Sequence, residues 1–182
     1  GLEHSYSVHY TKSFTINVEM KPGFGGLDIT KLLTGSETAK VPAGTTFQVG
    51  INYTLPGGAT VDTYPGWQAP GTVNQARTGG STSMTVTVGE KAVYNGTFPV
   101  GTVLTLDEDT TTASATPAGV VWGSHTFTVG DQNTNSLTVE DQKSTAVTLR
   151  NSADPAAVEE GDFTVTKALA GDGDFSKSTF EF

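Results

Sequence analysis

The sequence predicts an all-β domain built from short strands and frequent turns. Three observations support this fold class. Threonine and other β-branched residues are abundant, and 22 glycines and 8 prolines punctuate the chain. Short stretches alternate between apolar and polar residues, as half-buried strands do. No long segment carries the 3.6-residue apolar repeat of an amphipathic helix.

Length, charge and cysteine content narrow the classes of protein. The 182 residues can hold one domain or a tight pair of domains. A net charge of −9 argues against binding to a nucleic-acid backbone, which needs clustered Lys and Arg. Without Cys there is no disulfide, thiolate nucleophile or Cys-ligated zinc. No apolar run is long enough to span a bilayer and no signal peptide is recognised, so we expect no membrane span in this fragment.

One strand motif occurs twice, which suggests a tandem array of modules. In LDITKLLTG, residues 27–35, Leu27, Ile29 and Lys31 fall at period two and share one face of a strand. The motif returns as FTVTKALAG, residues 163–171, with Thr, Lys, Leu and Gly at the same places. The lysine on an otherwise apolar face is unusual, because an isolated buried ammonium is costly.

The chain is therefore interpreted as one complete module between parts of its neighbours. The complete module is expected over residues 25–154. Residues 1–24 would supply the final strand of a preceding module, over Lys12–Met20, and a linker rich in Pro and Gly. Residues 155–182 would supply a second linker and the first strands of a following module. The alternative is that Lys12–Met20 is the first strand of the same domain.

Alternation predicts the remaining strands of the complete module in order. The longest clean alternation runs from Phe47 to Leu55. Pro56–Ser83 is rich in Gly, Pro and Thr and is expected to form long loops with at most short strands. STSMTVTV and KAVYNGTF are predicted to form a hairpin around Gly89-Glu90. Further strands are expected in GTVLTLDEDTTT, TPAGVVWGSHTFTVG, SLTVED and STAVTLRN, with ADPAAVEEG as a linker.

Three polar side chains are predicted to lie on apolar strand faces. They are Lys31, Glu108 beside two leucines, and Asn151 beside Val147 and Leu149. A buried lysine tends to lose its proton and a buried carboxyl tends to keep one. A neutral amine beside an amide is a nucleophile beside an electrophile, and a protonated carboxyl can relay protons. The product would be a Lys–Asn isopeptide bond with release of ammonia. A buried hydrogen-bonded cluster and a strand-end ion pair are the alternatives.

The order of these residues resembles the CnaB-type domains of Gram-positive adhesins and pilins, and most closely the repeated modules of actinobacterial surface proteins. The resemblance runs through LDITKLLTG, VPAGTTFQV, GTVLTLDE, GVVWGSHTFTV and STAVTLRN. It implies an Ig-like Greek-key β-sandwich with an intramolecular isopeptide bond. By this resemblance Lys31 would be the nucleophile, Asn151 the acceptor and Glu108 the catalytic acid/base. A Tyr-Pro-Lys pilin motif and a sortase sorting signal are absent from these residues.

The expected function is that of a stalk module in a cell-wall-anchored, extracellular adhesin or pilus-like protein of a Gram-positive, actinobacterial cell. Its one reaction would be a single turnover on itself, so we do not expect an enzyme. Its partners would be adjoining modules of the same protein, without cofactor, metal or nucleic acid. The competing hypothesis is a glycan- or protein-binding module in which the loop TYPGWQAPG presents Tyr64 and Trp67 to a host ligand.

The remaining features are a spacing that partly matches a calcium loop and the two ends of the chain. Asp131, Asn133 and Asn135 have the spacing of a calcium loop, but Ser136 replaces the required Gly, so a turn is predicted. Lys167 repeats Lys31 without a matching Glu or Asn, and it is expected to stay unreacted. The two terminal remnants are expected to pair between neighbouring molecules, head to tail.

Overall fold

The computed structural model describes residues 18–158 as a β-sandwich with three short 3₁₀ turns. The strands are β1 Phe24–Thr34, β2 Thr46–Thr54, β3 Thr72–Val73, β4 Gly79–Thr87, β5 Lys91–Val93, β6 Phe98–Pro99, β7 Val103–Asp109, β8 Val120–Val129, β9 Gln132–Asn133, β10 Ser136–Thr138 and β11 Ser144–Pro155. The 3₁₀ turns are η1 Thr38–Lys40, η2 Val61–Thr63 and η3 Thr110–Thr112. The predicted all-β fold class is confirmed.

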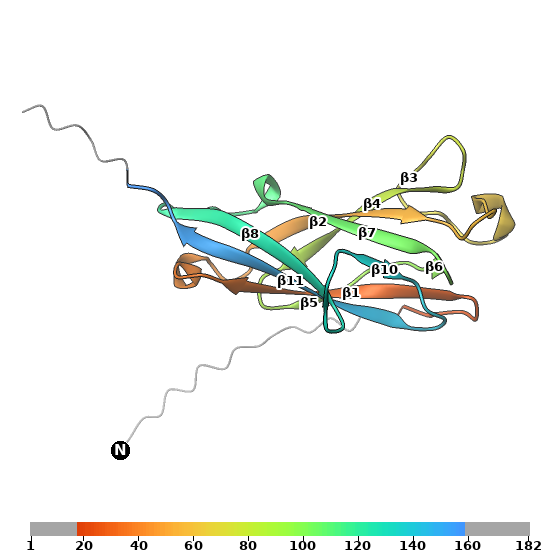
Figure 1. Cartoon of the computed structure of the whole chain (residues 1–182), viewed down its shortest axis with the longest axis horizontal. Coiled ribbons are helices and arrows are strands. Elements are labelled where there is room, and N and C mark those ends of the chain that lie inside the picture. The colour runs from red at the N-terminus through yellow and green to blue at the C-terminus, as the bar shows by residue number, and fades with distance from the viewer. Residues whose placement is uncertain (1–17, 159–182) are drawn as a thin grey trace, which may run out of the picture.

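The strands form two sheets that pack against each other (Figure 1). The first sheet has the order β5-β1-β11-β8-β9, with β6 also paired to β1, and the second has the order β10-β7-β2-β4-β3. After β4 the chain adds β5 and β6 to the first sheet and returns as β7 beside β2, which is a Greek-key connection. Apolar side chains from both inner faces fill the space between the sheets.

The first and last strands lie side by side in the middle of the first sheet. β1 and β11 run parallel, with Lys31 opposite Leu149 and Leu33 opposite Asn151. Parallel neighbours must be joined by a crossover, and here the crossover is nearly the whole domain. The side chains of Lys31 and Asn151 share the inner face, because residues at odd positions of both strands point into the core.

The alternation patterns gave the buried faces correctly. In β2, Phe47, Val49, Ile51 and Tyr53 are buried, as predicted from their period-two spacing. In β7 the buried positions are Leu104, Leu106 and Glu108, again the predicted face. One face of each strand therefore supplies the core, and the opposite face is largely polar.

The predicted hairpin around Gly89-Glu90 is wrong. β4 pairs with β2 in the second sheet, whereas β5 pairs with β1 in the first sheet, so the chain crosses between sheets at this turn. The strand expected in KAVYNGTF is also divided, because residues 94–97 separate β5 from β6. Alternation indicates which residues face the core but not which sheet a strand joins.

The boundaries of the first and last strands differ from the expected linkers. β1 begins at Phe24, inside the expected Pro/Gly linker, and its first residues pair with β6. β11 continues through Ala153–Pro155, expected as linker, and pairs there with β8 beyond an irregularity that follows Asn151. Residues 18–20, the described end of the expected strand Lys12–Met20, are not in a strand.

The rest of the expected N-terminal strand lies outside the described residues. So do Lys167, the second copy of the motif and the expected pairing of the two ends. Among residues 18–158, no helix is long and apolar enough to cross a membrane.

Candidate functional site: a buried lysine–glutamate–asparagine cluster

Lys31, Glu108 and Asn151 meet in the core between the two sheets. Lys31 comes from β1 and Asn151 from β11, which are neighbours in the first sheet, while Glu108 reaches across from β7 in the second sheet. Lys31 and Asn151 have no exposed surface, and Glu108 is 5% exposed. Residues that are 120 positions apart in sequence are thereby brought into contact.

The three side chains form a closed ring of hydrogen bonds. The Lys31 ammonium Nζ donates to Glu108 Oε2 at 2.9 Å and also to Asn151 Oδ1. Asn151 Nδ2 donates to Glu108 Oε1. Each polar group therefore has a partner, which offsets the large cost of burying it. The amine also lies directly against the oxygen of the amide group.

The surroundings of Lys31 disfavour its charged form. Burial lowers the pKa of Lys31, and the hydrogen bond and charge of Glu108 oppose that effect only in part. The Phe47 ring lies beneath the amine, with Nζ 4.3 Å from the ring centroid, and Trp122 packs edge-on against Phe47 at 5.0 Å. These rings exclude water from that side of the amine.

The backbone around Lys31 is held on both sides. On one side β11 runs parallel to β1. On the other side the crossover turn after β4 makes two hydrogen bonds: Gly89 N–H donates to Lys31 C=O at 2.7 Å, and Lys31 N–H donates to Glu90 C=O at 3.0 Å. The turn in which the chain changes sheets therefore holds the Lys31 backbone in place.

The acceptor strand is also irregular at the site. The β8–β11 register shifts between Asn151 and Ala153, and Thr34 Oγ1 donates to the Asn151 C=O at 3.4 Å. A bulge of this kind re-aims the side chain next to it. Asn151 is therefore positioned by local backbone geometry as well as by its two side-chain partners.

Sequence periodicity found the three polar residues but missed the parts that support them. Phe47 was predicted to be a core residue, yet nothing in the sequence indicated that its ring faces Lys31. The predicted hairpin does not place Gly89-Glu90 beside β1, so the sequence did not indicate the contact of this turn with Lys31.

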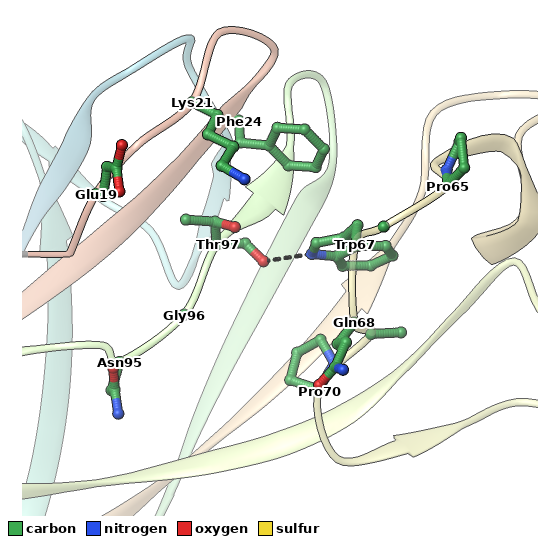
Figure 2. A pocket seen from close by; sticks show the side chains of 12 residues that line it. Glu19, Lys21, Phe24, Pro65, Trp67, Gln68, Pro70, Asn95, Gly96 and Thr97 are labelled. Atoms are coloured by element: carbon green, nitrogen blue, oxygen red, sulfur yellow. Dashed lines mark hydrogen bonds between the residues drawn. The ribbon is translucent and has the colours of Figure 1, made fainter.

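The other predicted site residues, Tyr64 and Trp67, lie in the long loop before β3. Both are half-buried, and their rings meet edge to face at 6.0 Å. Trp67 packs edge-on against Tyr53 of the core and donates its indole N–H to the Thr97 C=O at 2.8 Å (Figure 2). Tyr64 packs against Phe24 at 6.3 Å. The aromatic pair is thus largely engaged with its own domain.

Among the described residues, no group of three or more His, Cys, Asp or Glu could hold a metal ion.

Comparisons with known proteins give structural likenesses only. No family model matches the sequence, and no curated protein matches it. Among solved structures, the pilus-presented adhesin Cpa is similar over 74% of this chain and 28% of its own, at 17% identity and a TM-score of 0.43. An adhesin from Mobiluncus mulieris with intramolecular disulfide, isopeptide and ester bond cross-links matches over 74% of this chain and 42% of its own, at 20% identity and a TM-score of 0.38.

The major pilin T3.2 from Streptococcus pyogenes matches over 74% of this chain and 45% of its own, at 13% identity and a TM-score of 0.37. In each case the match spans less than half of the other protein. The two-sheet sandwich agrees with the all-β fold class that the sequence predicts.

Proposed function

We propose that this chain is a structural module of a bacterial surface adhesin or pilus-like protein, and that its core forms an isopeptide bond between Lys31 and Asn151. The observation that carries the proposal is the closed, buried contact of one amine, one carboxyl and one carboxamide. An ordinary structural salt bridge would not need the carboxamide to touch both partners. A buried ion pair is also weak evidence for stability by itself.

The reaction requires only groups that are present in the cluster. Lys31 gives a proton to the carboxylate of Glu108 across the 2.9 Å hydrogen bond, which leaves a neutral amine and a protonated carboxyl. The amine attacks Cγ of Asn151, and the carbonyl electrons move to Oδ1. Glu108 donates its proton to Nδ2, the Cγ–Nδ2 bond breaks and ammonia leaves. The surplus proton on the new amide nitrogen returns to Glu108, which ends protonated.

The site favours this sequence of proton transfers for physical reasons. Burial lowers the pKa of Lys31, which favours the neutral, nucleophilic form of the amine. Glu108 contacts both the attacking and the leaving nitrogen, so it can act as base toward one and acid toward the other. The fixed geometry replaces a bimolecular encounter, which is a large part of the barrier for amide exchange.

A bond at this position would suit a module that transmits tension. The chain enters the sandwich at β1 and leaves it at β11, and the bond would connect these two strands directly. Force applied at the ends would then pass through Lys31 and Asn151 and bypass residues 32–150. Such a covalent link could also replace the disulfides that this Cys-free chain lacks.

The test is the intact mass of the denatured chain. The wild-type protein should weigh less than its sequence by one ammonia, and Glu108→Gln, which keeps the side-chain shape but relays protons poorly, should have the full mass. The matched control is Glu140→Gln, a change at an exposed glutamate outside the cluster that should leave the mass loss intact. A folded wild-type chain of full mass would rule out the bond.

A further inference from the structure

A groove of about 580 Å³ lies beside Trp67, at a site separate from the lysine–glutamate–asparagine cluster (Figure 2). Residues from three segments line it: the stretch that leads into β1, the long loop before β3, and residues 95–97 between β5 and β6. Its volume falls within the range of about 300–1,000 Å³ that is common for small-ligand sites. The proposed stalk function does not use this groove.

The long loop that forms one wall is braced by specific bonds. Trp67 Nε1 donates to the Thr97 C=O at 2.8 Å, and Tyr53 Oη donates to the Pro70 C=O at 2.7 Å. Asp62, near the start of the loop, accepts two 3.0 Å hydrogen bonds from Arg77, which lies between β3 and β4. A long loop with little secondary structure is uncommon in a compact domain and is often functional. Because this one is fixed without a ligand, binding would cost little ordering entropy.

The groove combines aromatic surface with exposed polar side chains. Trp67 and Phe24 contribute the rings, and Glu19, Lys21, Gln68 and Asn95 contribute a carboxylate, an ammonium and two carboxamides. All four polar side chains are exposed. Within residues 18–158, none of them makes a side-chain hydrogen bond or ion pair, whereas the indole N–H of Trp67 is already engaged.

We propose that this groove binds a neutral oligosaccharide. A sugar ring has an apolar face of C–H groups, which packs on aromatic rings, and a rim of hydroxyls, which act as both donors and acceptors toward carboxamides and charged groups. The single Glu19 and Lys21 cancel in charge, and the chain carries a net charge of −9, so a polyanionic ligand is disfavoured.

A peptide fits the groove less well than a sugar. An extended or proline-rich peptide presents a row of backbone carbonyls, which an aromatic-lined groove must satisfy with donors. The Trp67 indole N–H, the donor on the aromatic wall, is bonded to Thr97 instead, so the donors left among the exposed polar side chains of the groove are Lys21 and the two carboxamides, none of which lies on a ring. The carboxamides of Gln68 and Asn95 can exchange donor and acceptor roles, which suits hydroxyls.

The experiment measures binding of the full chain to an array of immobilised short neutral oligosaccharides. Heparin oligosaccharides and a proline-rich peptide serve as the comparison probes. We expect the chain to bind at least one neutral oligosaccharide and to bind neither heparin nor the proline-rich peptide. For that sugar, Gln68→Ala and Asn95→Ala should each weaken binding by about three- to tenfold, the range for one lost hydrogen bond.

Asn52→Ala is the matched control, because Asn52 is an exposed carboxamide on β2 outside the groove. It should bind like the wild type. The proposal would be overturned if the chain bound no neutral oligosaccharide, or if it bound only heparin or only the peptide. Equal binding by the Gln68, Asn95 and Asn52 variants would also overturn it. The intact mass of the same samples reports the isopeptide bond separately, so either proposal can fail without the other.

Discussion

At the scale of single residues, the core is distinguished by three polar side chains that satisfy one another. Each would be costly to bury alone. Together they close a ring in which the amine touches both the carboxyl and the amide oxygen. The aromatic ring of Phe47 keeps the amine desolvated. Burial therefore makes the pKa of Lys31 lower in the folded chain than in the unfolded chain.

Asn151→Ala should leave the Lys31 amine free, and the stability of this variant should rise with pH. Burial holds the pKa of Lys31 below its usual value of 10.5. Between the lowered pKa and 10.5 the unfolded chain binds more protons than the folded chain, so the free energy of unfolding increases with pH. This contribution is fully present above 10.5 and is lost as the pH falls through the folded-state pKa.

Urea denaturation at a series of pH values measures the effect. The reference is the double variant Lys31→Met/Asn151→Ala, which lacks the titrating amine and should show a smaller pH slope in the same window. If the two proteins have equal slopes, the pKa of Lys31 is not lowered by burial.

At the scale of elements, the turn between β4 and β5 holds the reactive strand. Gly89 has a φ of +80°, a conformation that costs a residue with a side chain about 1–2 kcal/mol, although a Cβ there would meet nothing within 4 Å. Its N–H donates to the Lys31 C=O. Strain at Gly89 would therefore shift the backbone of Lys31 and, with it, the position of the amine.

Gly89→Ala should slow formation of the cross-link. The cross-linked fraction is followed by mass during cell-free synthesis, so that the reaction is observed from its start. Gly58→Ala is the control, because Gly58 has a φ of +81° and equally open space, but it lies in the long loop after β2 rather than in the turn bonded to Lys31. Gly89→Asn tolerates positive φ and should react nearly as fast as the wild type. Equal rates for Gly89→Ala and Gly58→Ala would contradict this role.

Strand faces could be predicted from the sequence, but strand partners could not. Period-two spacing placed Lys31, Glu108 and Asn151 on inner faces, because alternation is a local property of the chain. The contact among them depends on β1 and β11 being parallel neighbours and on β7 lying opposite, which are long-range properties. The same limit explains the wrong hairpin, since two consecutive strands in a sandwich can join different sheets.

At the scale of the whole molecule, the two strands that connect to the rest of the chain are adjacent and parallel. A bond from Lys31 to Asn151 would close a loop of nearly the entire domain. By analogy with the loop entropy of disulfides, it would stabilise the fold by about 5 kcal/mol. No pattern in the sequence predicted this adjacency; it was implied only by the resemblance to CnaB-type domains.

Under tension, the wild-type chain should not extend through the segment 32–150. In a single-molecule pulling experiment with handles at both ends, Asn151→Ala should show an unfolding step of roughly 400 Å, the extended length of that segment. The wild type should lack this step at forces that unfold the variant. An unfolding step of the same length in both proteins would show that tension passes through the whole fold.

The most direct test of the account is to identify the peptides that the bond would join. The wild-type chain is denatured, digested with trypsin and analysed by tandem mass spectrometry. We expect a branched species in which the side chain of Lys31 is linked to Asn151 with the loss of one ammonia, and no cleavage after Lys31. Separate linear peptides, with Lys31 cleaved and Asn151 unmodified in a chain that was folded before digestion, would contradict it.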